Sequence, residues 1–133
     1  MVNSDLLHES TPKLSQNLSS WLNCQNVEEV VIVDWSSDPP LKGYLEQNGF
    51  ASQKLRCLRV DDQSSWILTW AFNLAMISAR FDKIIKIDCD IYLSPDFIQK
   101  NNGFDRLSYN SFYTGDWQKS IQIHLNGQIV LKK

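Results

Sequence analysis

The sequence predicts an α/β fold in which helices cover both faces of a mostly parallel, Rossmann-like sheet that is followed by a C-terminal β-hairpin. Short β-branched runs alternate with longer segments that carry apolar residues at helical spacing. Near the C-terminus, an Asn-Gly pair separates two alternating segments, which indicates a hairpin. The length of 133 residues, with 43% hydrophobic and 21% charged residues, favours a single domain over residues 1–133.

The first half of the chain predicts helices and strands in alternation. Thr11 suits an N-cap, and Pro12 suits the first position of the helix that follows. The β-branched run 30–33 predicts a buried parallel strand. A short helix over 41–48 and a second strand over 54–60 are expected next.

The second half continues the same alternation. A helix is expected over 66–80, and the apolar run 84–88 predicts a further buried strand. A short helix over 94–100 follows, with Ser94 as its N-cap. The hairpin is centred on residues 126–127.

Charge and cysteine content narrow the possible partners and the compartment. The formal net charge of −2 provides no cationic field for nucleic acid, so no nucleic-acid partner is expected. Cys24, Cys57 and Cys89 are odd in number, lack metal-ligand spacing and suit reduced thiols. Neither a secretory signal nor a transmembrane run is recognised, and a cytoplasmic location is expected.

Aspartates end two of the predicted strands. Asp34 follows the first run, and Asp88 and Asp90 follow the run at 84–88. Ligands of open parallel sheets bind beyond the carboxyl ends of the strands, so the three acids are expected to face one crevice. Side chains two apart on an extended segment point the same way, so Asp88 and Asp90 suit shared binding of Mg²⁺ or Mn²⁺.

Each acid also has a structural interpretation, and both interpretations are open at this stage. Asp88 and Asp90 suit a metal because apolar residues flank them, yet a solvated strand end is the alternative. Asp34 suits a hydrogen bond to a ribose or a base edge, or else a cap for the turn that follows it.

Four neighbouring polar and aromatic positions are candidates of the same kind. Trp35 is expected either to line a pocket or to cover the sheet edge. Ser36 and Ser37 are donors to a ligand or ordinary turn residues. Asn73 is the single amide in the helical stretch WAFNLAM, where it contacts a ligand or satisfies a neighbouring backbone group.

These segments together resemble a known family. VEEVVIVDWSSD and WAFNLAMISARFDKIIKIDCDIYLSPDF are similar to the donor-binding half of family 2-type glycosyltransferases with a GT-A fold, bacterial galactosyltransferase-like members in particular. The resemblance covers roughly residues 14–131 and includes FYTGDW at 112–117. It maps the uridine-binding acid onto Asp34 and the metal-binding Asp-X-Asp motif onto residues 88–90.

The resemblance implies a reaction and its ligands. A hexosyl group would move from a nucleotide-diphosphate sugar, UDP-sugar favoured, to a hydroxyl of a glycan or another acceptor. Mn²⁺ or Mg²⁺ bound by Asp88 and Asp90 would neutralise charge on the leaving diphosphate. No catalytic base is identified. The implied donor-nucleotide contacts are Asp34, Trp35, Ser36, Ser37, Asn73 and Asp88.

The chain departs from the family at both ends, which leaves alternatives open. The first strand and the acceptor-binding part are expected to be missing, so the domain is expected to be partial. A catalytically inactive nucleotide-sugar-binding module is therefore one alternative. A haloacid dehalogenase-like phosphatase is another, but Tyr92 stands where that motif usually has threonine.

Overall fold

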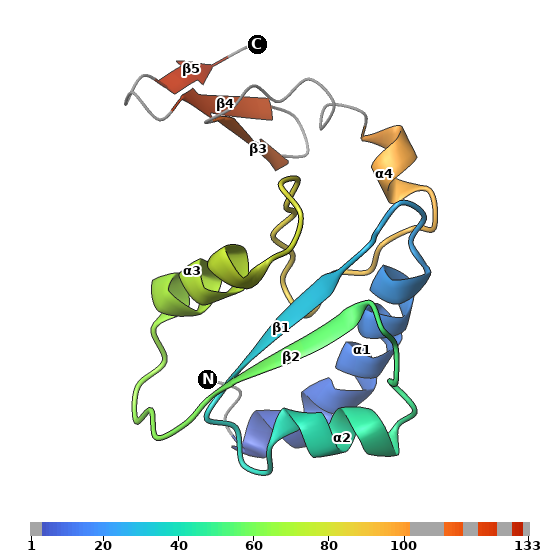
Figure 1. Ribbon diagram of the computed structural model, residues 1–133, viewed down its shortest axis with the longest axis vertical. Helices are drawn as coiled ribbons and strands as arrows, with labels where there is room; N and C mark the ends of the chain where they lie inside the picture. The colour runs from blue at the N-terminus through green and yellow to red at the C-terminus, as the bar shows by residue number, and fades with distance from the viewer. Residues whose placement is uncertain (1–3, 102–110, 116–119, 125–128, 132–133) are drawn as a thin grey trace. The chain divides into compact units, whose positions relative to one another are not determined.

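A computed structural model describes residues 4–101, 111–115, 120–124 and 129–131. The chain divides into two compact units, Met1–Phe97 and Ile98–Lys133, and each is described by itself. The first unit contains a parallel pair of strands with helices around it, and the second contains an antiparallel sheet (Figure 1). The α/β class expected from the sequence is confirmed for the described part of the chain.

The parallel sheet of the first unit consists of β1 (Val30–Trp35) and β2 (Leu55–Val60). Val30 lies opposite Leu55, and Trp35 lies opposite Val60. Both strands were expected from their sequence, and both end at the same edge of the sheet (Figure 1). The loops that follow the two strands are thereby brought together.

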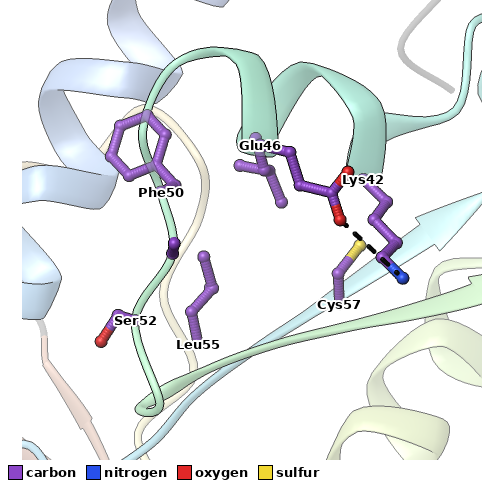
Figure 2. Close-up of a pocket in the computed structure, with 8 residues that line it drawn as sticks. Lys42, Glu46, Phe50, Ser52, Leu55 and Cys57 are labelled. Carbon is purple, nitrogen blue, oxygen red and sulfur yellow. Dashed lines mark ion pairs between the residues drawn. The ribbon is translucent and has the colours of Figure 1, made fainter.

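Helices α2 (Leu41–Gln47) and α3 (Leu68–Ser78) cover opposite faces of this sheet. Cys57 points toward α2 (Figure 2), whereas the neighbouring Arg56 donates a hydrogen bond to the Ser78 carbonyl at the end of α3. Successive side chains of a strand point to opposite faces, so this alternation separates the two helices. The helix predicted over 66–80 is confirmed, and its observed bounds are two residues shorter at each end.

The first helix, α1 (Ser4–Asn23), begins earlier than expected. The prediction that Thr11 caps the helix is wrong, because both Thr11 and Pro12 lie inside it. An interior proline removes one helical hydrogen bond and crowds the carbonyl four residues earlier, yet α1 runs through this position. From residue 14 onward the expected apolar face is present, and Leu18 and Trp21 are buried.

Residues 89–93, which follow α3 in the chain, lie along α1 because α1 side chains form hydrogen bonds to their backbone. Polar side chains of α1 supply these bonds, and the buried Leu93 and Cys24 lie in the same region. The contacts are Asn17 Nδ2 with the Cys89 carbonyl at 2.9 Å, Trp21 Nε1 with the Ile91 carbonyl at 2.7 Å and Ser20 Oγ with the Leu93 amide at 3.0 Å.

The strand expected over 84–88 does not form, and that prediction is wrong. The segment has no strand partner among the described residues, so its β-favouring sequence has no ladder to join. Ile84 is 45% exposed, whereas Ile85 and Ile87 are half-buried. The apolar run that suggested a buried strand is therefore only partly buried.

A buried carboxylate fastens the end of α3 to the start of the sheet. Glu29 accepts hydrogen bonds at 2.8 Å from both Arg56 Nη1 and Arg80 Nε, and at 2.9 Å from the Arg80 amide. Burial alone would raise the pKa of Glu29, but these hydrogen bonds outweigh it and the pKa is lowered. The carboxylate therefore stays ionised, and it joins β1, β2 and the residues after α3.

The second unit contains β3 (Ser111–Gly115), β4 (Ser120–His124) and β5 (Ile129–Leu131) in an antiparallel sheet of order β3-β4-β5. The predicted turn at 126–127 lies outside the described residues. The four-residue helix α4 (Phe97–Lys100) stands where the helix 94–100 was expected. In the described part of the chain, no helix has both the length and the apolar character that a membrane span needs.

Candidate functional site

The carboxyl ends of β1 and β2 form a corner that we call the carboxyl corner, consisting of residues 34–37 and 59–66. The parallel register places Asp34 opposite Arg59 and Trp35 opposite Val60. Four of the expected site residues, Asp34 to Ser37, therefore lie in one place. The edge of a parallel sheet beyond its carboxyl ends is where ligands of open α/β sheets bind.

Asp34 lies at the centre of the carboxyl corner and is only 3% exposed. Its Oδ1 accepts hydrogen bonds from the amide and the hydroxyl of Ser37, and its Oδ2 accepts one at 2.9 Å from the Leu41 amide. Leu41 is the first residue of α2, whose N-cap Pro40 makes no side-chain cap bond. Asp34 therefore accepts the hydrogen bond of the Leu41 amide, which has no partner within the helix, although the two residues are seven positions apart.

Arg59 completes the environment of Asp34. Its Nη1 donates to Asp34 Oδ2 at 2.7 Å and to the Ser37 carbonyl at 2.7 Å, and its Nε donates to Asp61 at 2.7 Å. Burial raises the pKa of Asp34, but hydrogen bonds from Ser37, Arg59 and Leu41 outweigh it and the pKa is lowered. Bonds to Asp61 and Asp34 raise the pKa of Arg59. Asp34 is thus an ionised, fully engaged carboxylate.

The prediction allowed Asp34 either a ligand contact or a turn-capping role, and its contacts are those of the capping role. Both carboxylate oxygens are occupied by protein donors.

Ser36 connects the two loops of the carboxyl corner. Its amide and its hydroxyl both donate to the Val60 carbonyl, at 2.8 and 2.9 Å, and its Oγ accepts from the Gln63 amide at 2.9 Å. Ser36 and Asp62 have φ values of 55° and 57° in the left-handed region, which is uncommon for residues other than glycine. Such backbone persists only where surrounding contacts enforce it, and here the cross-loop bonds do so.

Trp35 contributes an aromatic side chain to the same corner. Its Nε1 donates to the Ser65 carbonyl at 2.8 Å. Its ring meets that of Trp66 edge-to-face, with centroids 5.8 Å apart and an interplanar angle of 88°. Trp35 is half-buried, and Trp66 is 39% exposed.

The Asp-X-Asp acids lie in a separate segment and are solvent-exposed. Asp88 and Asp90 are both exposed, so the expectation that buried acids demand a cation does not hold. The Ile91 amide donates to the Asp88 carbonyl at 3.1 Å, which makes this segment a turn. The expectation that an extended backbone aligns the two carboxylates is therefore also wrong.

We call residues 88–91 the acidic turn, and neighbouring groups define its chemistry. Lys86 Nζ lies 2.6 Å from Asp88 Oδ1 and 5.0 Å from the centroid of the Phe72 ring. Asn73 is exposed on α3. No group of three or more His, Cys, Asp or Glu with metal-binding geometry occurs within the described ranges. The acidic turn provides two accessible carboxylates, and a cation there would compete with Lys86 for Asp88.

Sequence reasoning missed Arg59, Gln63 and Trp66. Arg59 had a readable signal, because it occupies the same position near the end of β2 that Asp34 occupies near the end of β1. Charges of opposite sign at matching places on neighbouring parallel strands suit an ion pair. The roles of Gln63 and Trp66 depend on loop conformation, for which the sequence offers no such pattern.

A small hollow of about 260 Å³ lies between α2 and β2, away from the carboxyl corner (Figure 2). Phe50, Leu55 and Cys57 line it, together with the ion pair of Lys42 and Glu46 at 3.9 Å. Burial, and then the charge of Asp34, raise the pKa of the Cys57 thiol. The raised pKa makes this thiol a weaker nucleophile at neutral pH.

The chain was compared with protein families, curated proteins and solved structures. No protein-family model, no curated protein and no solved structure matches the chain. The resemblance to family 2-type glycosyltransferases accordingly stays a prediction from the sequence.

Proposed function

We propose that this chain binds a nucleotide-diphosphate sugar, with UDP-sugar favoured, as the donor-binding part of a metal-dependent glycosyltransferase of GT-A type. The observation that carries the proposal is the carboxyl corner, where two loops at the end of a parallel sheet are fastened together by side chains. Ligands of open α/β sheets bind at such edges. The Asp-X-Asp sequence adds the chemistry of a diphosphate site.

In this proposal Asp34 is a positioning residue. It is buried and engaged by Ser37, Leu41 and Arg59, so it fixes the loop 36–40 without touching the donor. The exposed backbone and side chains of that loop would then meet the nucleotide. Because the loop is fixed before binding, less conformational entropy is lost when the nucleotide binds.

The acidic turn supplies the second half of the proposed site. Mg²⁺ is commonly bound through one or two carboxylates and substrate phosphates, so the exposed Asp88 and Asp90 fit it, and Mn²⁺ takes the same oxygen ligands. When bound, the metal would neutralise negative charge on the leaving diphosphate. Asp88 would exchange its ion pair with Lys86 for the cation.

Calorimetry with UDP and Mn²⁺ tests the proposal. We expect metal-dependent UDP binding to the wild-type chain and a loss of at least about tenfold in affinity for Asp90→Asn, because a charged carboxylate becomes a neutral amide. Asp82→Asn removes the same charge from an exposed acid nearby and serves as the matched control. Unchanged binding in Asp90→Asn, or no metal-dependent binding by the wild type, contradicts the proposal.

A measurement of sugar release distinguishes an active transferase from a module that only binds the donor. An active transferase releases sugar from a UDP-sugar slowly in the presence of Mn²⁺, even without its acceptor. A module that binds UDP with Mn²⁺ but releases no sugar, with or without acceptors, keeps the donor site and lacks catalysis. The sugar-release assay with Asp90→Asn as the blank distinguishes the two.

A further inference from the structure

The Trp35–Trp66 pair is an aromatic surface within the carboxyl corner. The two rings stand at 88° to each other, so the edge of one ring meets the face of the other. Trp35 is fixed by its bond to the Ser65 carbonyl, whereas Trp66 is 39% exposed. An indole of which more than a third is exposed retains apolar surface for a planar partner.

The backbone beneath Trp66 is fastened in place. The Gln63 amide donates to Ser36 Oγ, and the Ser65 carbonyl accepts from Trp35 Nε1. Both ends of the short segment before Trp66 are therefore bonded to the last residue of β1 or to the residue after it. Trp66 therefore stands on a supported loop, at the place where a ligand of the sheet edge is expected. Large aromatic side chains held in this way bind with little loss of conformational entropy.

We infer that Trp66 stacks on the base of the bound nucleotide. The inference rests on the proposed function, and it assigns to Trp66 a contact that the Asp-X-Asp resemblance does not supply. A nucleobase is planar and has an accessible π-face, and stacking on aromatic side chains is a general way to bind it.

The contribution of stacking is separable from that of the phosphates. Inorganic pyrophosphate with Mn²⁺ carries the diphosphate contacts but has no base. UDP with Mn²⁺ carries both. A stacking residue therefore affects UDP and leaves pyrophosphate unchanged.

Calorimetry on four forms of the chain measures this difference. Trp66→Leu keeps an apolar side chain against Trp35 but removes the aromatic face, and Trp66→Phe restores an aromatic face. Trp70→Leu is the matched control, because Trp70 is 58% exposed on α3 outside the carboxyl corner. We expect Trp66→Leu to weaken UDP about tenfold, Trp66→Phe to recover most of the affinity, and Trp70→Leu to match the wild type.

Each other outcome overturns the inference in a recognisable way. Equal UDP affinity in Trp66→Leu and wild type excludes stacking and leaves the proposed function standing. An equal loss for UDP and pyrophosphate shows an effect on the phosphate site, which excludes stacking as well. If the wild type binds UDP no more tightly than pyrophosphate in the presence of Mn²⁺, the base makes no contact and the inference fails alone. If it binds neither ligand, the proposed function fails with the inference.

Discussion

Two apolar runs in this chain end on aspartate, and they fold differently. The run at 30–34 becomes strand β1, and its Asp34 is 3% exposed with both oxygens engaged. The run at 84–88 stays outside any described sheet, and its Asp88 is exposed beside Lys86. The same local pattern thus gives a structural carboxylate in one place and an accessible one in the other.

The difference arises from the neighbours that each run finds. β1 lies beside β2, which brings Arg59 opposite Asp34 and supplies a cation for a buried acid. The residues after 84–88 instead bond to side chains of α1 through their backbone carbonyls. An acid at the end of an apolar run is therefore a candidate ligand only where no neighbouring strand provides its partner.

The largest expected effect is on stability. Asp34→Ala leaves the Ser37 and Leu41 amides without their acceptor, and we expect a loss of about 3 kcal/mol in the free energy of unfolding. Asp88→Ala, in the exposed run, is expected to change it by less than about 0.5 kcal/mol. Urea unfolding of the two variants measures both. Equal losses would remove the distinction between the two acids.

A smaller effect is expected from pH. The folded pKa of Asp34 lies below its ordinary value of 3.8, and that of Glu29 below 4.5. Their contribution to stability is therefore complete above these ordinary values and is lost as the pH falls through the lower folded values. The effect is smaller than that of Asp34→Ala, because a protonated side chain still occupies its place and keeps part of its hydrogen bonding.

Urea midpoints between about pH 7 and about pH 3 measure this loss. Asp34→Asn removes one of the two titrating groups, so its stability should fall less steeply with acid than that of the wild type. A wild type whose stability stays constant or rises on acidification over this range would contradict the assigned direction of both pKa shifts.

The sequence predicted what depends on local pattern. A β-branched run located β1, and alternation located β2. The acid at the end of β1 was recognised as a candidate either for binding or for capping. The apolar face expected for the first helix is also present, with Leu18 and Trp21 buried.

The sequence did not predict what depends on long-range pairing. Whether 84–88 joins a sheet depends on a partner strand, and no local signal encodes that choice. The start of α1 was misplaced because Pro12 is favoured in a first helical turn and disfavoured in a helix interior, which is where it lies. The positions of Trp66 and Gln63 in the carboxyl corner depend on loop geometry, which includes left-handed backbone at Asp62.

Paramagnetic broadening by Mn²⁺ in the presence of UDP tests the central claim most directly, because it locates the metal on the chain. We expect the strongest broadening of amide resonances at Asp88, Cys89 and Asp90, and its disappearance in Asp90→Asn but not in Asp82→Asn. Absence of site-specific broadening in the wild type, or the same broadening in Asp90→Asn, would contradict the assignment of the acidic turn as the metal site.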